Sequence, residues 1–140
     1  MKEDSVSYSV SNFINMLVSA FSEDSAAKES ENDKLSYYSW TEEQDVLNQD
    51  KQLDRKNAAR LLHMYMKCEL GIKDVTDITP AYELRDLFDC RVCANHIAQV
   101  YLQGVMNAAK IGDMKIFDSN ADFTEREARE SIKKLSEIAK

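Results

Sequence analysis

A helix start with a complete capping signal lies near the C-terminal end of the chain and strongly constrains its fold. Residues 116–128 read IFDSNADFTEREA, in which Thr124 is followed three positions later by Glu127. In such a capping box each side chain bonds the other residue's backbone N–H at the first turn of a helix. The apolar Phe123 directly before the cap suits the contact that fixes how a chain approaches a helix. The stretch therefore predicts an extended approach, a polar turn and a helix beginning at Thr124.

The same order of residue types occurs at two other places. Residues 8–14, YSVSNFI, and residues 53–59, LDRKNAA, each place an apolar residue before a cap-type residue, polar positions and an apolar helix face. Two sets of positions become equivalent: Tyr8, Leu53 and Phe123 before the cap, and Asn12, Asn57 and Glu127 after it. Although the intervals between the stretches are unequal, the pattern is typical of internal repetition, which would determine the whole fold.

Helical spacing of apolar residues continues from each of these starts. It predicts helices over residues 9–22, 54–70 and 124–138, a further helix over 89–108, and short helices over 42–48 and 81–87. Gly71 is a natural end for the helix over 54–70, because glycine accepts a left-handed backbone conformation. One proline and three glycines in 140 residues argue against a β-sandwich. The predicted fold is an all-α single domain, residues 1–140, of four to five main helices, with a strand-like connector near 114–116.

Residues 117–128 resemble the junction between two bacterial S-layer homology motifs, where Phe and a polar turn precede an apolar residue and Thr-Arg-Ala-Glu. The matching positions are Phe117, Asn120, Phe123, Thr124, Glu127 and Ala128. Glu125 stands at the family's arginine position, with Arg126 beside it. In the second stretch Arg55 keeps the arginine, while Asp54 and Asn57 replace the threonine and the glutamate. Residues 73–75 and 97–106 resemble other parts of the motif, so the resemblance covers most of residues 50–140.

The resemblance implies pseudo-repeats over residues 8–52 and 53–122 and a partial one over 123–140. It also implies a non-catalytic, extracellular domain that anchors a bacterial protein to its cell wall by binding an anionic secondary cell-wall polysaccharide near helix N-termini. There, N–H groups and a partial positive charge attract anions, and an arginine adds a bidentate clamp. The implied ligand-binding residues are Asp54, Arg55, Asn57, Thr124, Arg126 and Glu127, with Trp40 as a stacking face for a sugar.

Composition and motifs narrow the other functions. The net charge of -7 disfavours nucleic acid as a partner, because phosphate binding needs a basic surface. No run of residues approaches the roughly 18 apolar residues of a membrane span. The chain has no phosphate loop, dinucleotide fingerprint or nucleophile elbow, so we expect neither an enzyme nor a cofactor. The N-terminus lacks a signal-peptide pattern, which keeps a cytoplasmic location open beside the cell surface.

A protein–protein interaction module is the alternative to a glycan-binding domain. Residues 22–35, SEDSAAKESENDKL, are acidic and poor in large apolar side chains, which predicts a mobile loop. The aromatic residues Tyr37, Tyr38 and Trp40 follow directly. In this interpretation the loop and the aromatic cluster form the docking surface of a helical module, although such clusters are more often part of a core.

The cysteines and histidines suggest a third class, a metal- or redox-responsive protein. Cys90, Cys93 and His96 have the spacing of half a zinc site, which Cys68 and His63 would complete. Cys90 and Cys93 also fall on the apolar seam of the predicted helix over 89–108, where a reduced cysteine behaves as a small hydrophobic residue. This placement favours buried structural cysteines and no metal. Residues 118–129 likewise fail as a calcium loop, because Phe123 and Arg129 stand where such a loop needs glycine and glutamate.

Overall fold

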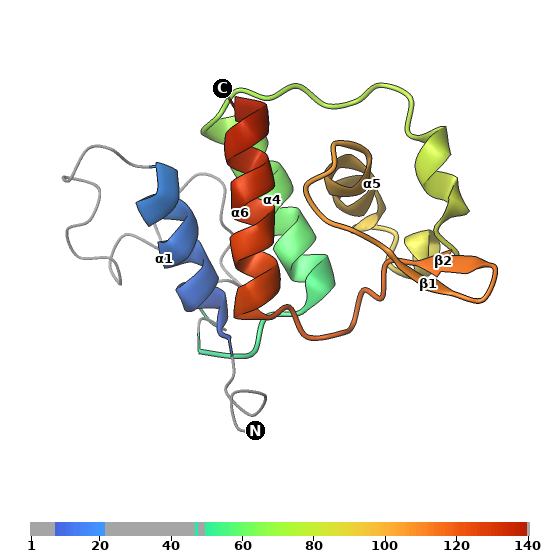
Figure 1. Ribbon diagram of the computed structural model, residues 1–140, viewed down its shortest axis with the longest axis horizontal. Coiled ribbons are helices and arrows are strands. Elements are labelled where there is room, and N and C mark those ends of the chain that lie inside the picture. The colour runs from blue at the N-terminus through green and yellow to red at the C-terminus, as the bar shows by residue number, and fades with distance from the viewer. Residues whose placement is uncertain (1–7, 22–46, 48–49, 140) are drawn as a thin grey trace.

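The computed structural model describes residues 8–21, 47 and 50–139 (Figure 1). The α-helices in this part are α1 (Val10–Phe21), α4 (Arg55–Cys68), α5 (Ala94–Leu102) and α6 (Glu125–Ala139). Two 3₁₀ helices, η4 (Thr79–Glu83) and η5 (Leu87–Asp89), precede α5, and two strands, β1 (Ala109–Ile111) and β2 (Met114–Ile116), follow it. The described chain is therefore mainly helical, as predicted, but the small sheet means that it is not purely all-α.

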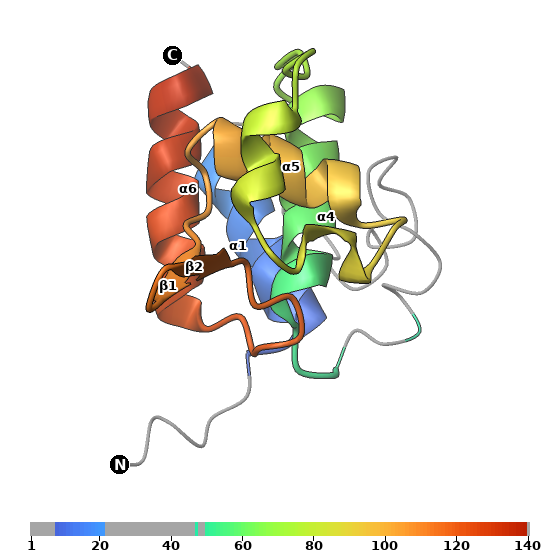
Figure 2. The same ribbon diagram turned by 90° about the vertical axis from the view of Figure 1, so that its right-hand side faces the viewer.

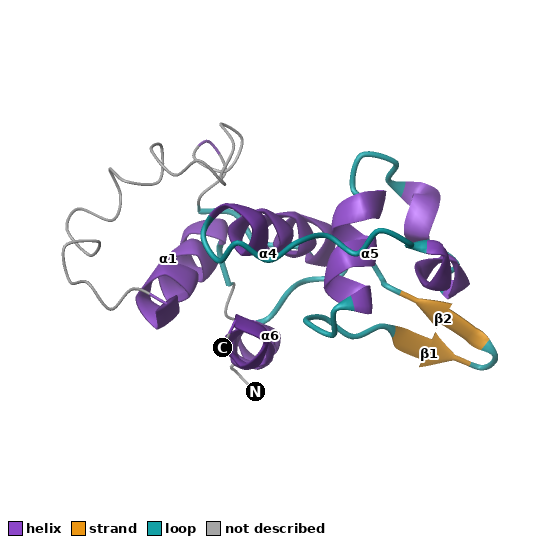
Figure 3. Cartoon of the chain, turned by 90° about the horizontal axis from the view of Figure 1, so that it is seen from above, coloured by secondary structure: helices purple, strands orange, loops and turns teal. Residues whose placement is uncertain are grey.

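Helix α4 lies in the middle of the arrangement. Viewed from above, α1 lies on one side of α4 and α5 on the other, while α6 lies beside α1 and α4 (Figure 3). Figure 2 shows α5 and the two 3₁₀ helices in front of α4 on the face that also carries the hairpin. The aromatic side chains of Phe13, Phe117 and Phe123 are fully buried between these elements. The core is therefore shared by elements that are distant in sequence.

The starts of α1, α4 and α6 gather at one end of the molecule (Figure 1). The Leu53 N–H donates to the Tyr8 carbonyl at 2.9 Å, and the Phe123 N–H donates to the Leu53 carbonyl at 2.8 Å. All three residues are buried, and Phe13 of α1 packs edge-on against Phe123 with ring centroids 5.1 Å apart. The three positions that the sequence made equivalent thus lie side by side and are joined through their backbones.

Each of the three helices is capped at its predicted start. The Thr124 hydroxyl accepts the Glu127 N–H and the Glu127 carboxylate accepts the Thr124 N–H, both at 3.2 Å, which is the predicted capping box. The other caps are Asp54, which accepts the Asn57 N–H at 3.0 Å, and Ser9, which accepts the Asn12 N–H at 3.1 Å. The helix starts predicted at residues 9, 54 and 124 are confirmed.

Helix α4 ends close to the predicted glycine. Gly71 has a φ of 68°, and the Ile72 N–H bonds back to the Met66 carbonyl at 2.9 Å. The left-handed conformation of Gly71 lets the chain turn back over the last turn of α4, as glycine commonly does at helix ends. Cys68 is exposed and is not part of a disulfide.

The predicted helix over residues 89–108 is wrong at both ends. Cys90 and Cys93 form a disulfide in the turn before α5, so the helix begins only at Ala94. After α5, Gly104 has a φ of 80° and reverses the chain. The following residues form β1, which pairs antiparallel with β2. The apolar spacing extended the predicted helix through both turns because it does not register a disulfide or a left-handed glycine.

Two other predicted elements have different outcomes. The short helix predicted over 81–87 is replaced by η4 and η5, two separate 3₁₀ turns, the first of which has Pro80 in its first turn. The strand-like connector predicted at 114–116 is confirmed as β2, and its partner β1 was not predicted. The helix predicted over 42–48, the acidic loop over 22–35 and the aromatic cluster at 37–40 lie outside the described residues, apart from Leu47.

Candidate functional site

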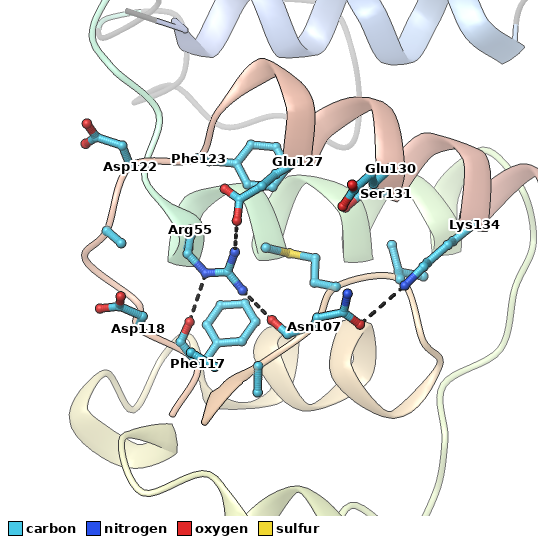
Figure 4. Close-up of a pocket in the computed structure, with 15 residues that line it drawn as sticks. Arg55, Asn107, Phe117, Asp118, Asp122, Phe123, Glu127, Glu130, Ser131 and Lys134 are labelled. Carbon is cyan, nitrogen blue, oxygen red and sulfur yellow. Dashed lines mark hydrogen bonds and ion pairs between the residues drawn. The ribbon is translucent and has the colours of Figure 1, made fainter. Parts of the chain in front are cut away.

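Arg55, the first residue of α4, lies at the centre of the candidate site (Figure 4). Its side chain points away from the helix axis and donates to three partners: the Phe117 carbonyl from Nε at 2.8 Å, the Glu127 carboxylate from Nη1 at 2.5 Å, and the Asn107 carbonyl from Nη2 at 2.5 Å. Its residue surface is only 8% exposed. A buried guanidinium with this many partners fixes three distant segments of chain against the start of α4.

Both backbone polar groups of Phe117 are hydrogen-bonded, the carbonyl to Arg55 and the N–H to Asp86. The Arg55 guanidinium lies 4.7 Å from the centre of the Phe117 ring, within the range of a cation–π contact. The Asp86 carboxylate accepts the N–H groups of Phe117 and Asp118, each at 2.7 Å, and that of Ser119 at 3.4 Å. Three consecutive N–H groups around one anion form a nest, which is an anion-binding arrangement of the backbone. Asp118 has a φ of 66°, so the turn that builds this nest passes through the left-handed region.

A pocket of about 250 Å³ opens beside Arg55. Its walls come from the first residue of α4, from residues 127–134 of α6, from residues 105–109 after α5, and from residues 117–123. Arg55 and Phe117 form its inner wall, and Lys134 reaches it from α6 (Figure 4). The Lys134 ammonium donates to the Asn107 side-chain oxygen at 3.3 Å. The pocket therefore presents a buried guanidinium, an ammonium and an amide to one small volume.

Carboxylates outnumber cations around the pocket. Its lining contains two basic residues and four acidic ones: Arg55 and Lys134, and Asp118, Asp122, Glu127 and Glu130. Glu127 is paired with Arg55, so the charge of Arg55 is largely compensated within the protein. Lys134 is the other basic residue of the lining. Its hydrogen-bond partner among the described residues is the neutral side-chain amide of Asn107. An acidic ligand would consequently find its favourable partner at Lys134, and its hydroxyl groups would find acceptors at the carboxylates.

The expectation of available N–H groups at the start of α4 is wrong. The N–H groups of Arg55 and Lys56 donate to the carbonyls of Ala121 and Ser119, both at 2.9 Å. The third N–H, that of Asn57, is taken by the cap residue Asp54. The first turn of α4 is thus used to bind the chain segment before α6, and an anion at this pocket has to be bound by side chains.

The predicted ligand residues have different places in the structure. Arg55 and Glu127 are brought together in the pocket wall, whereas Asp54, Asn57 and Thr124 act in helix caps. Asp54 also accepts from the Lys56 ammonium at 2.9 Å. Arg126 is exposed and is not part of the pocket lining. Trp40 lies outside the described residues.

Sequence reasoning missed three residues that build the site. Asn107, Lys134 and Asp86 come from a loop, the far half of α6 and the turn before η5, and none of them lies in a recognisable motif. Lys134 lies ten residues beyond the Thr124 cap, on a helix that was predicted correctly. Glu127, Glu130 and Lys134 are spaced three and four residues apart, so the sequence alone indicates that they share one face of α6.

The cysteines and histidines do not gather in one place. Cys90 and Cys93 are disulfide-bonded, which corrects the expectation of reduced, buried cysteines. His63 and His96 lie against each other, with their Nδ1 atoms 2.8 Å apart, and the second nitrogen of His63 lies 2.7 Å from Asp74. Across the described residues there is no group of three or more His, Cys, Asp or Glu side chains suited to holding a metal.

Comparisons with protein-family models, with curated proteins and with solved structures give no match to this chain. None of the helices in the described part of the chain is long and apolar enough to cross a membrane.

Proposed function

We propose that this protein is a non-catalytic domain that anchors to a bacterial cell wall by binding an acidic wall polysaccharide in the Arg55 pocket. The observation that carries the proposal is the placement of Arg55 and Lys134 in the wall of one pocket between the start of α4 and one face of α6. The resemblance of residues 50–140 to S-layer homology motifs supports the choice of ligand. The backbone contacts among Tyr8, Leu53 and Phe123 are consistent with helix starts that act as one unit.

The charges of the pocket suggest how such a ligand would bind. Sugar hydroxyl groups would donate to Asp118, Asp122 and Glu130, which line the pocket. An acidic substituent would pair with the Lys134 ammonium. Arg55 would keep its partners and hold the pocket in shape, since its charge is already paired with Glu127. The proposal therefore assigns attraction of the acidic group to Lys134 and organisation of the pocket to Arg55.

Sedimentation of the full chain with purified bacterial cell walls tests this function. Lys134→Ala removes a cation inside the pocket, whereas Arg129→Ala removes one from the same helix outside it, where Arg129 pairs with Glu125 and is 68% exposed. Since a hydrogen bond to a charged group contributes about 1.5–3 kcal/mol, we expect Lys134→Ala to weaken wall binding about 10- to 100-fold. Arg129→Ala should bind like the wild type.

Walls from which the polysaccharide has been extracted provide the second control. The wild-type chain should not sediment with them if the polysaccharide is the ligand. Binding to extracted walls that equals binding to intact walls would contradict the proposal. So would equal binding by the Lys134→Ala and Arg129→Ala proteins.

Docking of a protein partner is the second candidate function, and one surface observation favours it. Tyr82 of η4 and Phe88 of η5 are about half exposed, at 52% and 53%, and their rings pack edge-on with centroids 5.4 Å apart. Exposed aromatic side chains of this kind are enriched in protein interfaces. Phe88→Ser would abolish attachment while Lys134→Ala preserves it if a wall protein, and not a glycan, is the partner.

A further inference from the structure

A pair of histidines joins α4 to α5. His63 of α4 is 2% exposed, and its Nδ1 lies 2.8 Å from the Nδ1 of His96 on α5. The other ring nitrogen of His63, Nε2, lies 2.7 Å from a carboxylate oxygen of Asp74. Both nitrogens of a buried imidazole are thus engaged, one with a carboxylate and one with a second imidazole. The sequence contains two histidines, so this pair accounts for all of them.

The surroundings hold the carboxylate in place. Gln99 of α5 is buried, accepts the Val75 N–H at 2.8 Å and donates to the Val75 carbonyl at 3.0 Å, which fixes the segment that carries Asp74. The Lys67 ammonium lies 3.6 Å from Asp74. Burial would raise the pKa of Asp74, but the hydrogen bond and charge of His63, together with Lys67, outweigh burial and hold that pKa below its usual value.

Arg60 is another charged residue on α4. Arg60 precedes His63 by one helical turn, is buried, and donates to the Asn57 side-chain oxygen at 3.1 Å. Asp74, from the segment after α4, faces the His63 ring, Lys67 of α4 faces Asp74, and the two histidines face each other across the helices. The cysteines before α5 are disulfide-bonded and do not titrate.

The number of protons decides whether the pair stays bonded. With both rings neutral, His63 donates from Nε2 to Asp74 and accepts at Nδ1 from His96. With one added proton, His63 becomes an imidazolium that donates to both neighbours, and His96 accepts. With two added protons both Nδ1 atoms carry hydrogen, so neither can accept and two like charges face each other. The hydrogen bond between α4 and α5 therefore survives the first proton and is lost with the second.

We propose that His63 and His96 form a pH-sensitive lock between α4 and α5, closed at neutral pH and opened when both imidazoles are protonated. Histidine is suited to this role because its charge changes within the physiological pH range. Two titratable groups in direct contact also take up their protons in coupled steps. The lock is independent of any ligand and can be tested on the protein alone.

The lock makes stability depend on pH in a defined direction. In the unfolded chain both imidazoles take up protons near pH 6.5, the ordinary value for histidine. The folded chain with a closed lock holds at most one of these protons. Below about pH 6.5 the unfolded state holds more than one proton on the two rings, so there the folding equilibrium constant falls as pH decreases, by up to about tenfold per pH unit for one proton.

The lock also connects to the pocket. Arg55 begins α4, and residues 105–109, which line the pocket, follow α5. Opening the lock would therefore loosen two elements that form the pocket walls. If the proposed function holds, wall binding should weaken below about pH 6, near the ordinary titration of histidine. This consequence rests on the proposed function, whereas the lock itself does not.

Nuclear magnetic resonance of the two histidine rings between pH 5.5 and 8 tests the lock directly. We expect one ring to titrate before the other, with each transition visible in both rings, and nitrogen shifts that show one protonated and one unprotonated Nδ1 at intermediate pH. Denaturant unfolding should show a folding equilibrium that declines from about pH 6.5 to pH 5.5. His96→Asn should flatten that decline, because the amide cannot be protonated and can still accept a hydrogen bond at a similar position.

Two results would overturn the proposal. Independent titration of both rings, with no mutual influence on their signals, would show that they share no proton in the wild-type protein. If stability depends on pH equally in the wild type, His96→Asn and His96→Gln, then protonation of the histidine pair is not what lowers stability. The ring titration needs no variant, so failure of a variant to fold does not prevent a decision. The two proposals can fail separately. Lys134→Ala can lose wall binding while the two rings still titrate together, and the rings can titrate independently in a protein that still binds walls.

Discussion

Two regions of α4 are fastened to their neighbours by basic side chains of different chemistry. At its first residue, Arg55 binds the Phe117 and Asn107 carbonyls and the Glu127 carboxylate. Two turns later, His63 binds Asp74 and His96. Arginine stays charged at every pH that a folded protein tolerates, whereas the charge of histidine depends on pH. The comparison indicates that the attachment of α4 at Arg55 is independent of pH, whereas its attachment at His63 depends on pH.

Replacing Arg55 should have the largest effect on stability. Arg55→Ala leaves two carbonyls and a half-buried carboxylate without their donor, so we expect a loss of about 2–4 kcal/mol in the free energy of unfolding. Because arginine does not titrate, this cost should be the same at pH 5.5 and pH 8. Denaturant unfolding at both pH values measures it, with the exposed Arg129→Ala as control. A cost that halves at pH 5.5 would contradict a permanent attachment.

Replacing Asp86 should have the next largest effect. Asp86→Ala removes the anion from the N–H groups of residues 117–119, and we expect a loss of about 2–3 kcal/mol. Asp86→Asn keeps one acceptor oxygen and should lose less. Hydrogen exchange of the Phe117 and Asp118 amides, compared between the variants, reports whether the nest itself has loosened. Unchanged protection in Asp86→Ala would show that the nest does not depend on this carboxylate.

Replacing His63 sharpens the comparison because its effect should depend on pH. His63→Asn loses the contact with Asp74, and we expect a cost of about 1–2 kcal/mol at pH 7.5. At pH 5.5 the cost should be smaller, because the wild-type lock is itself weakened there. Unfolding curves of both proteins at the two pH values provide the measurement. An equal cost at both values would place His63 in the same permanent class as Arg55.

Replacing Thr124 should have the smallest effect of this series. Thr124→Ala removes one half of the capping box and should cost about 1 kcal/mol. The loss should appear at all pH values, because a hydroxyl group does not titrate in this range. Thr124→Ser, which keeps the hydroxyl, is the matched control in the same unfolding experiment. A cost above that of Arg55→Ala would mean that the helix start, and not the buried guanidinium, holds α6 in place.

The parts of the fold that the sequence predicted are those determined by neighbouring residues. The Thr124 cap and the Gly71 end depend on residues within one helical turn, and both are present in the structure. The bounds of α5 were missed because a disulfide and Gly104, neither visible in apolar spacing, end the helix on both sides. Local signals therefore located the helices and not the turns between them.

The candidate site shows the same division. Arg55 was predicted as a binding residue from its position in a motif, and it does lie in the pocket. Its partners are 52 to 72 residues away along the chain, so no local pattern showed that its charge is used inside the protein. Lys134 was missed for a related reason: its spacing from Glu127 and Glu130 shows that the three share a helix face, but not which segment of the chain lies opposite that face.

The central claim is that the pocket between α4 and α6 binds an acidic wall polysaccharide, and one measurement tests it most directly. Polysaccharide released from purified bacterial cell walls would be titrated into the isotopically labelled full chain and followed by the backbone amide resonances. We predict saturable shifts at Asn107, Phe117, Asp118 and Lys134, which disappear in Lys134→Ala and persist in Arg129→Ala. An absence of shifts, or shifts confined to Tyr82 and Phe88, would contradict the proposed glycan site.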